Sequence, residues 1–396
     1  MADLTTKKEP KVYRIKTFNN ISHEGLKLLP ANFIAGPDIE DPDAILVRSA
    51  DLHDYEFTKN VRFIGRAGAG VNNIPVDRCS EKGIVVSKAP GANANGVKEL
   101  VLTALLLSSR DVIGGIDWVR NYKKDDIAKA VESNKKRFAG PELMGKTLGV
   151  IGLGATGRRV AKMGIDMGMD VYGYDPFLSI GNALHLDTRV NVLEDPKDVF
   201  TRADYVTLHI PYTKDTKNFV GDELLSVAKP NMRLINIARG GLVDLEALKK
   251  YIDAGIVARY IVDFPDPDTV RLPNTINIPH LGASTPESEE NSAKMVVRQL
   301  VDYLDNGNIR HSVNFPDSNM GACKSMARIT VNHRNIPNMI GQITAVLADA
   351  HINIANLLNR HRVDWAYTMI DVDSPVDESL RERLLAIDGV VRVRFM

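Results

Sequence analysis

A glycine-rich segment near the middle of the chain has the spacing of a nucleotide-binding turn. Residues 148–157 read Leu-Gly-Val-Ile-Gly-Leu-Gly-Ala-Thr-Gly, an apolar run that ends in Gly-x-Gly-x-x-Gly. Gly152 would allow a tight turn, Gly154 would let the backbone approach a pyrophosphate, and Gly157 would let a helix pack closely on its strand. The spacing therefore predicts a strand, a turn and a helix whose N-terminus binds a dinucleotide.

An acidic residue follows this turn at the distance expected for a ribose ligand. Asp175 ends the next predicted strand, 18 residues beyond Gly157. A carboxylate there accepts hydrogen bonds from the ribose hydroxyls and repels a 2′-phosphate, so NAD is favoured over NADP. The alternative is a plain glycine turn with a surface aspartate.

Three further segments place charged residues and a histidine after predicted strands. They contain Arg239, the aspartates Asp263 and Asp266, and His280. Because ligands bind beyond the carboxyl ends of the strands in an open parallel sheet, we expect these segments to converge. Hydride transfer from a 2-hydroxy acid needs a base for the hydroxyl proton, a cation for the carboxylate and an acid to tune the base. Taken singly, each residue is more often a surface or turn residue.

The hydrophobic pattern predicts two parallel α/β frameworks that would position these residues. Short apolar runs in the first 90 residues predict strands over 12–18, 33–35, 44–48, 61–65 and 84–87. A second series begins at Lys146 and continues with strands over 170–174, 204–210, 233–237, 258–264 and 275–278. Strands that alternate with helical segments imply two Rossmann-like, doubly wound lobes.

Two helices and a third domain complete the predicted organisation. One long apolar-rich helix is expected from Asn95 to about Tyr122, and a second, capped near Ser284, is expected to run to about Asn306. Residues 314–322 have the polar, Pro/Gly-containing composition of a linker. The last 70 or so residues follow the order βαββαβ, which is ferredoxin-like.

The composition excludes several classes of function. The 396 residues are 44% hydrophobic and 25% charged, as in folded globular domains, and 50 basic residues balance 50 acidic ones. We therefore expect neither a nucleic-acid nor a membrane partner. Only Cys79 and Cys323 are present, without metal-ligand spacing, and the N-terminus has no apolar signal region. No metal and a cytoplasmic location are expected.

Taken together, the glycine fingerprint, Asp175, Asn-Ile-Ala-Arg239-Gly-Gly and Pro-His280-Leu-Gly-Ala-Ser resemble the D-specific 2-hydroxyacid dehydrogenase family. The resemblance covers nearly the whole chain. It implies that Arg239 binds substrate and that His280 is the catalytic acid/base. The organisation we predict is a discontinuous substrate lobe, an NAD-binding domain, a linker and a regulatory domain, over residues 1–92 with 283–314, 93–282, 315–322 and 323–396.

Two N-terminal segments resemble the substrate lobe of family members that act on D-3-phosphoglycerate. They are Val47-Arg48-Ser49-Ala50 and the glycine-rich stretch from Gly65 to Asn73. The resemblance implies that Arg48 and Arg66 meet the phosphate, a bidentate task suited to guanidinium. It also assigns backbone contacts with the substrate to Ser49, Gly68, Ala69 and Gly70. The alternative for the arginines is an ordinary structural ion pair.

One segment departs from the family pattern. The family usually has a glutamate before a proline after this strand, whereas residues 263–268 here read Asp-Phe-Pro-Asp-Pro-Asp. Either Asp266 or Asp268 replaces that glutamate, or neither does, and we favour Asp266 as the partner of His280. Asp263 is expected to face the nicotinamide. The other cofactor contacts implied by the resemblance are Ala155, Thr156, Thr207, Ile237 and Ala238.

The C-terminal unit resembles an ACT domain, a small amino-acid-binding regulatory module. His333, Asn335 and Asn353 lie in segments similar to those that bind serine in family members with this module. The resemblance implies an L-serine effector at a subunit interface and a homo-oligomer, either a dimer or a tetramer. The family usually has glycine at the position of Asn338, but asparagine tolerates the left-handed conformation that this turn needs. The alternative is a tail that only dimerises.

The activity implied by the resemblance is oxidation of D-3-phosphoglycerate at C2 to 3-phosphohydroxypyruvate, with hydride transfer to NAD. This reaction is the first step of L-serine biosynthesis. Two alternatives stay open. One is the same chemistry on another D-2-hydroxy acid, such as glycerate or lactate. The other is an NAD(H)-sensing scaffold with little turnover.

Overall fold

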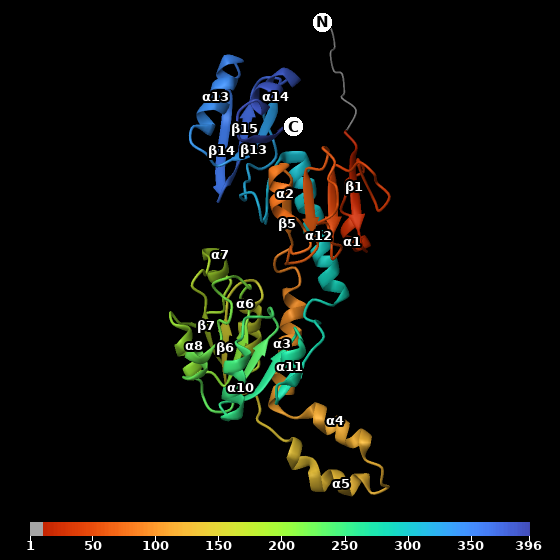
Figure 1. The fold of residues 1–396 in the computed structure, drawn as a ribbon, viewed down its shortest axis with the longest axis vertical. Coiled ribbons are helices and arrows are strands. Elements are labelled where there is room, and N and C mark those ends of the chain that lie inside the picture. The colour runs from red at the N-terminus through yellow and green to blue at the C-terminus, as the bar shows by residue number, and fades with distance from the viewer. Residues whose placement is uncertain (1–10) are drawn as a thin grey trace. The chain divides into compact units, whose positions relative to one another are not determined.

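Three β-sheets organise residues 11–396, the part of the chain described by the computed structural model (Figure 1). Contacts between Cα atoms divide the chain into two compact units. One unit comprises the chain up to Ala92 together with Glu289–Met396, and the other comprises Asn93–Ser288. Two sheets are parallel and the third is antiparallel, so the predicted fold class is confirmed. None of the helices within residues 11–396 combines the length and apolar character needed to cross a membrane.

The first sheet lies in the discontinuous unit and has the strand order β2-β1-β3-β4-β5, with all pairs parallel. Its central strand is buried on both faces, as expected of a parallel sheet. The long helix α12 returns the chain to this sheet, and Val296 and Tyr303 of α12 share a core with Phe63. The elements are β1 (Tyr13–Phe18), α1 (His23–Leu26), β2 (Phe33–Gly36), β3 (Ala44–Val47), β4 (Phe63–Arg66), α2 (Val76–Glu81), β5 (Val85–Lys88) and α12 (Pro286–Asn306).

The second sheet has seven parallel strands in the order β12-β11-β10-β9-β6-β7-β8. The strand order reverses between β6 and β9, and such a switch point is where open α/β sheets bind ligands. The strands are β6 (Thr147–Ile151), β7 (Asp170–Tyr174), β8 (Asn191–Val192), β9 (Tyr205–Leu208), β10 (Met232–Asn236), β11 (Val257–Val262) and β12 (Thr275–Asn277). The connecting helices are α6 (Gly157–Asp166), α7 (Ile180–Ala183), α8 (Pro196–Arg202), α9 (Asp222–Leu225), α10 (Leu245–Asp253) and α11 (Pro267–Arg271).

The prediction of a single long helix from Asn95 to about Tyr122 is wrong. The segment forms α3 (Ala94–Ser109) and α4 (Val112–Asn121), because Arg110 is extended and the side chain of Asp111 caps α4 by accepting from the N–H of Gly114. After α4 come α5 (Ile127–Asn134) and a short 3₁₀ turn (Lys135–Phe138). Figure 1 shows α4 and α5 as an arm that extends away from the sheet of their own unit.

The third sheet is antiparallel and has the order β14-β15-β13-β16. Its elements follow the predicted βαββαβ order. Asn338 adopts the left-handed conformation with φ +61°, as this turn requires. The elements are β13 (Ala327–Arg334), α13 (Met339–Asp349), β14 (Ile354–Arg362), β15 (Trp365–Val372), α14 (Glu378–Leu385) and β16 (Val390–Phe395).

The first part of the segment that composition indicated as a linker is packed into the core, whereas Asp317, Asn319 and residues 321–322 are exposed. Phe315 is fully buried, and the Asn314 side chain donates to Ser80 Oγ and to the carbonyl of Ile84. The buried Phe315 side chain and the hydrogen-bonded Asn314 amide therefore place this stretch in the core although its composition is polar. The same core includes Tyr367 and Met369 of β15, so one face of the third sheet packs against the first unit's own core.

Candidate active site

The glycine-rich turn joins β6 to α6 at the switch point of the second sheet. A Cβ on Gly157 would clash with the Gly152 carbonyl oxygen, and Gly152 has φ +91°. A Cβ on Gly154, in contrast, would meet no atom within 4 Å, so this side of the turn is open. Within residues 11–396 the N–H groups of Gly154 and Ala155 have no backbone acceptor, and Thr156 precedes the first residue of α6. The turn thus offers free donors at a helix N-terminus, which fits a pyrophosphate.

Asp175 is fixed beside this turn at the end of β7. One oxygen of its carboxylate accepts from the N–H of Leu153 at 2.9 Å, and the other accepts from the N–H of Phe177 at 2.9 Å. A carboxylate has additional lone pairs for ribose hydroxyls. The structure therefore brings the acid and the glycine turn together, as the spacing predicted.

His209 is a residue of this region that sequence reasoning missed. It follows β9, and its Nε2 lies 3.1 Å from Oγ1 of the predicted contact Thr207. Although part of the residue reaches solvent, the imidazole is enclosed, and this burial lowers its pKa to about 3. The ring is thus neutral at physiological pH. A histidine directly after a buried strand, in Leu-His-Ile-Pro, was the available signal.

Arg239 is positioned by the end of β10. The Oδ1 atom of Asn236 accepts from the N–H groups of Ala238 and Arg239, and Nδ2 of Asn236 donates to the Arg239 carbonyl at 2.8 Å. The preceding Ile237 is buried. Because Asn236 is itself buried in the strand, this small loop holds the arginine in a defined place.

His280 and Arg239 both lie close to the ring of Phe264. The imidazole and the Phe264 ring have centroids 4.6 Å apart, and the Arg239 guanidinium is 5.8 Å from the centroid of that ring. His280 has φ +56°, an uncommon conformation that clusters at functional sites. The carboxyl ends of β10, β11 and β12 therefore bring Arg239 and His280 together around Phe264. Sequence reasoning gave no role to this aromatic residue.

Asp263 anchors the loop that carries His280. Its carboxylate is buried, and its two oxygens accept from the N–H groups of Leu281 at 2.7 Å and Gly282 at 2.8 Å. Burial raises the pKa of Asp263, against the lowering effect of these N–H donors and of the nearby His280. Both carboxylate oxygens of Asp263 thus bind the loop that carries His280. The sequence had not indicated this role for Asp263.

Replacing Asp263 with asparagine tests this anchoring. Asparagine keeps one acceptor and turns an NH₂ group toward a backbone N–H, so one buried donor loses its partner at a cost of about 1–3 kcal/mol. We expect a lower free energy of unfolding and faster amide exchange of residues 280–283, measured by mass spectrometry. Asp268→Asn, at an exposed position of the following helix, is the matched control. Unchanged exchange in that loop would contradict the anchoring role.

The structure does not support Asp266 as the partner of His280. Asp266 is the N-cap of α11, where its Oδ1 accepts from the N–H groups of Asp268 and Thr269 and the Thr269 hydroxyl completes a capping box. Asp268 lies 3.7 Å from Arg271, exposed to solvent. In the described residues neither carboxylate makes a hydrogen bond or ion pair with His280. The proline after Asp266 starts a helix, and the helix uses the carboxylate as its cap.

The predicted substrate residues gather at the carboxyl ends of β3 and β4. The Arg48 guanidinium makes a 2.6 Å ion pair with Glu289 at the start of α12, and the N–H of Ser49 donates to the Asn19 side chain. The Arg66 guanidinium lies against Gly68, where any Cβ would collide with it. Within residues 11–396 the N–H groups of Ala69 and Gly70 make no backbone hydrogen bond, so they remain available to a ligand.

The three predicted serine contacts do not meet within one chain. Both ring nitrogens of the buried His333 are used internally, by the Thr368 hydroxyl and the Arg334 carbonyl. Asn335 donates to the Val363 carbonyl beside His333. Asn353, which donates to Asp373, precedes β14 at the opposite end of the sheet. Along β15, the residue paired with His333 (Ala366) and the residue paired with Ile354 (Val372) are six positions apart, or about 20 Å at the rise of a strand.

Comparison with known proteins identifies similar sequences over most of the chain. The family model described as D-isomer specific 2-hydroxyacid dehydrogenase, NAD binding domain, matches residues 102–282. The D-3-phosphoglycerate dehydrogenase of Methanocaldococcus jannaschii is 33% identical over 333 residues, which are 81% of this chain and 60% of that protein. This chain thus spans about three-fifths of that relative. The enzyme of the same name from Escherichia coli K12 is 32% identical over 348 residues, covering 84% of this chain and 81% of that protein.

A solved structure shares the fold. The crystal structure of a cofactor (NAD⁺)-bound 3-phosphoglycerate dehydrogenase from Entamoeba histolytica aligns with a TM-score of 0.59 and 25% identity. The alignment covers 76% of this chain and 99% of that one. About a quarter of this chain therefore has no counterpart there.

Proposed function

Because this chain belongs to the D-isomer-specific 2-hydroxyacid dehydrogenase family, we propose that it oxidises D-3-phosphoglycerate to 3-phosphohydroxypyruvate, the first step of L-serine biosynthesis. The observation that carries the proposal is the convergence of Arg239 and His280 on the Phe264 ring, in the same unit as the glycine turn. A cation and an acid/base side by side are what a 2-hydroxy acid requires. The names of the relatives favour the phosphorylated substrate.

The cofactor is NAD, because residues 102–282 form the family's NAD-binding domain. The open side of Gly154 and the fixed carboxylate of Asp175 fit the pyrophosphate and a ribose without a 2′-phosphate. When bound, NAD supplies the hydride acceptor. The residues of this chain bind and orient it.

In the proposed mechanism the two residues beside Phe264 act on the substrate. The His280 imidazole takes the proton of the C2 hydroxyl, and the Arg239 guanidinium holds the carboxylate and stabilises the charge that develops on the C2 oxygen. The Phe264 ring contacts both side chains and sets their spacing. Asp263 keeps the His280 loop in place through the N–H groups of Leu281 and Gly282.

The first unit is proposed to hold the rest of the substrate. The free N–H groups of Ala69 and Gly70 suit a carboxylate, and the guanidinium groups of Arg48 and Arg66 suit a phosphate. Arg48 already pairs with an anionic group, the Glu289 carboxylate, across the start of α12. A phosphate would compete for the same fork of donors.

We also propose a homo-oligomer in which L-serine binds between two copies. Edge strand β14 is nine residues long and exposed, and antiparallel pairing of two such edges would bring the Asn353 end of one copy to the His333 end of the other. On the α4–α5 arm, Val112, Ile116 and Val119 are 42–51% exposed, which supports a second contact between copies.

The proposed location is the cytoplasm. The two unpaired cysteines are in keeping with its reducing conditions.

The proposed activity is tested by NADH formation from NAD and D-3-phosphoglycerate at alkaline pH, with and without millimolar L-serine. We expect turnover with the phosphorylated acid and much slower turnover with D-glycerate or D-lactate. Inhibition by serine would support the effector site, and turnover without inhibition would remove it. Equal rates with D-glycerate would overturn the substrate assignment, and NAD binding without any turnover would favour a sensing scaffold.

Arg48→Gln tests in the same assay whether Arg48 binds the phosphate of the substrate. The substitution removes one charge-assisted contact, worth about 1.5–3 kcal/mol, so the KM for D-3-phosphoglycerate should rise about 10- to 100-fold. The KM for NAD should stay unchanged. A raised KM for NAD would indicate a structural role for Arg48 instead.

A further inference from the structure

Five cationic side chains converge on one pocket where the third sheet meets the first unit's own parallel sheet. The pocket has a volume of about 440 Å³. Lys11 and Arg62 lie just before the first residues of β1 and β4, and Arg392 and Arg394 come from β16. The fifth, Arg381, comes from α14. We call this space, with those five side chains, the basic pocket.

Carboxylates neutralise only part of this charge. Arg62 pairs with Asp43 at 3.1 Å, and Arg381 pairs with Glu378 at 2.5 Å. Asp305 is the single carboxylate side chain among the described lining residues, and no ion pair ties it to a cation. Met396, the last residue of the sequence, also lines the pocket, and its backbone oxygen accepts from the N–H of Arg328.

Arg394 is the most deeply buried of the five cations and makes no ion pair within residues 11–396. The residue is only 7% exposed, and its guanidinium donates to the carbonyls of Tyr303 and Leu304 and lies 4.4 Å from the centroid of the Tyr303 ring. In residues 11–396 no carboxylate lies within ion-pair distance of it. A buried charge that lacks a counter-ion is costly, so a bound anion would stabilise this arrangement.

Two of its neighbours in the basic pocket, Arg392 and Lys11, also make no ion pair within residues 11–396. Arg392 donates only to the carbonyls of Lys82 and Lys59, and Gly83 leaves room for its stem. Burial lowers the pKa of Arg392 to about 10, with Arg394 and Arg62 adding to the effect. Burial and then Arg62 lower the pKa of Lys11. Neighbouring cations therefore destabilise the charged forms of Arg392 and Lys11, and an anion would relieve that repulsion.

We propose that the basic pocket binds a small phosphate-bearing anion, either inorganic phosphate or the phosphate of a short organic ester. A volume of about 440 Å³ admits such a molecule but not a polymer. Guanidinium groups present forked donors that match phosphate oxygens. Because Lys11 and Arg62 precede strands of the first sheet while Arg392 and Arg394 belong to β16, the anion ties the third sheet to the first. The proposal does not depend on the substrate proposed above.

The site is tested by hydrogen exchange of the full chain with and without inorganic phosphate at constant ionic strength. We expect about tenfold slower exchange of residues 390–396 at saturating phosphate, because ligand binding to the folded state suppresses opening. Local readout separates this pocket from any phosphate bound at Arg48 and Arg66. A three-carbon phosphate ester is titrated in parallel, and stronger protection by the ester than by phosphate identifies an organic ligand.

The paired variant Lys11→Gln/Arg381→Gln should abolish this protection, whereas Arg383→Gln should retain it. Arg383 lies on the same helix α14 but is exposed and pairs with Asp349, outside the pocket. If the double variant does not fold, Lys11→Gln alone serves. The Lys11 side chain makes no hydrogen bond or ion pair within residues 11–396, and its one hydrogen bond there, accepted by its backbone carbonyl from Asn32, is kept in the variant. This variant should weaken phosphate binding several-fold. Equal protection by chloride, or undiminished protection in these variants, would overturn the proposal.

Discussion

His280→Ala should lower kcat for D-3-phosphoglycerate oxidation by about 10²- to 10⁴-fold, the usual contribution of a positioned general acid/base. The imidazole, which the geometry places beside Arg239, is the proposed proton acceptor, and alanine would leave only solvent to take the hydroxyl proton. The measurement is steady-state NADH formation, with NAD affinity followed by quenching of protein fluorescence. We expect that affinity to change little, because the proposed cofactor contacts are the glycine turn and Asp175, which lie at other strand ends.

A double-mutant cycle with Asp266 tests the revised environment of His280. Asp266→Ala removes a helix cap and should cost about 1 kcal/mol of stability. If Asp266 acts only as a cap, its effect on kcat is small and adds to that of His280→Ala. Strong non-additivity would restore Asp266 as the histidine's partner. A decrease in kcat of less than tenfold for His280→Ala would contradict the proposed mechanism itself.

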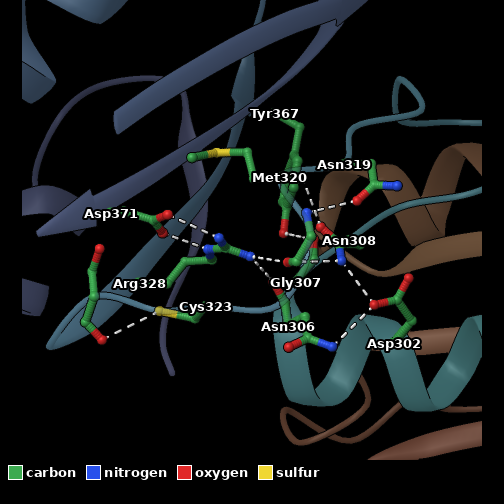
Figure 2. Close-up of polar contacts among 12 residues, drawn as sticks. Asp302, Asn306, Gly307, Asn308, Asn319, Met320, Cys323, Arg328, Tyr367 and Asp371 are labelled. Carbon is green, nitrogen blue, oxygen red and sulfur yellow. Dashed lines mark hydrogen bonds and ion pairs between the residues drawn. The ribbon is translucent and has the colours of Figure 1, made fainter. Parts of the chain in front are cut away.

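Asp371→Ala should destabilise the first unit by about 3–5 kcal/mol, because it leaves a buried guanidinium without its counter-ion. Figure 2 shows Arg328 held by both carboxylate oxygens of Asp371 and by two carbonyls, those of Asn306 and Gly321. The Arg328 side chain is fully buried and Asp371 is 7% exposed. The arginine therefore joins β13 and β15 to the end of α12 and the chain that follows it.

The measurement is urea-induced unfolding, followed by the fluorescence of Trp365, which packs edge-on against Phe315 in the same core. Asp373→Ala, at an exposed position just beyond β15, is the matched control and should change stability by less than about 0.5 kcal/mol. Replacing both partners, as Arg328→Met with Asp371→Leu, should be milder than Asp371→Ala alone, since no charge is left buried. If Asp371→Ala were as stable as the control, the pair would contribute nothing to docking of the third sheet.

Several features of the fold were readable from local sequence. Short apolar runs predicted the strands of both parallel sheets to within a residue or two, except the two-residue β8, since the burial pattern of a strand is a local property. The helix from Pro286 also begins where a hydroxyl cap and a proline place it, with the Thr285 hydroxyl accepting from the N–H of Ser288. The final βαββαβ order was predicted in the same way.

Other features depended on contacts between residues far apart in the chain. The expected long helix breaks at Arg110 although its apolar pattern continues, because Asp111 starts a new helix that leads into the arm. The polar segment after Asn314 is buried at its start because Phe315 packs into a core built from distant parts of the chain. Periodicity and composition contain no information about such partners.

For the candidate site, the sequence by itself determined which residue types stand at the carboxyl ends of the strands: the glycine turn, Asp175, Arg239 and His280. Because the carboxyl ends of parallel strands lie on one side of a sheet, the convergence of these residues was predictable without the strand order. Only the tertiary structure decided what each carboxylate does. Asp266 caps a helix and Asp263 holds the His280 loop, because a buried or terminal N–H takes whichever acceptor the fold brings within reach. The same holds for the basic pocket, whose cations come from both ends of the chain.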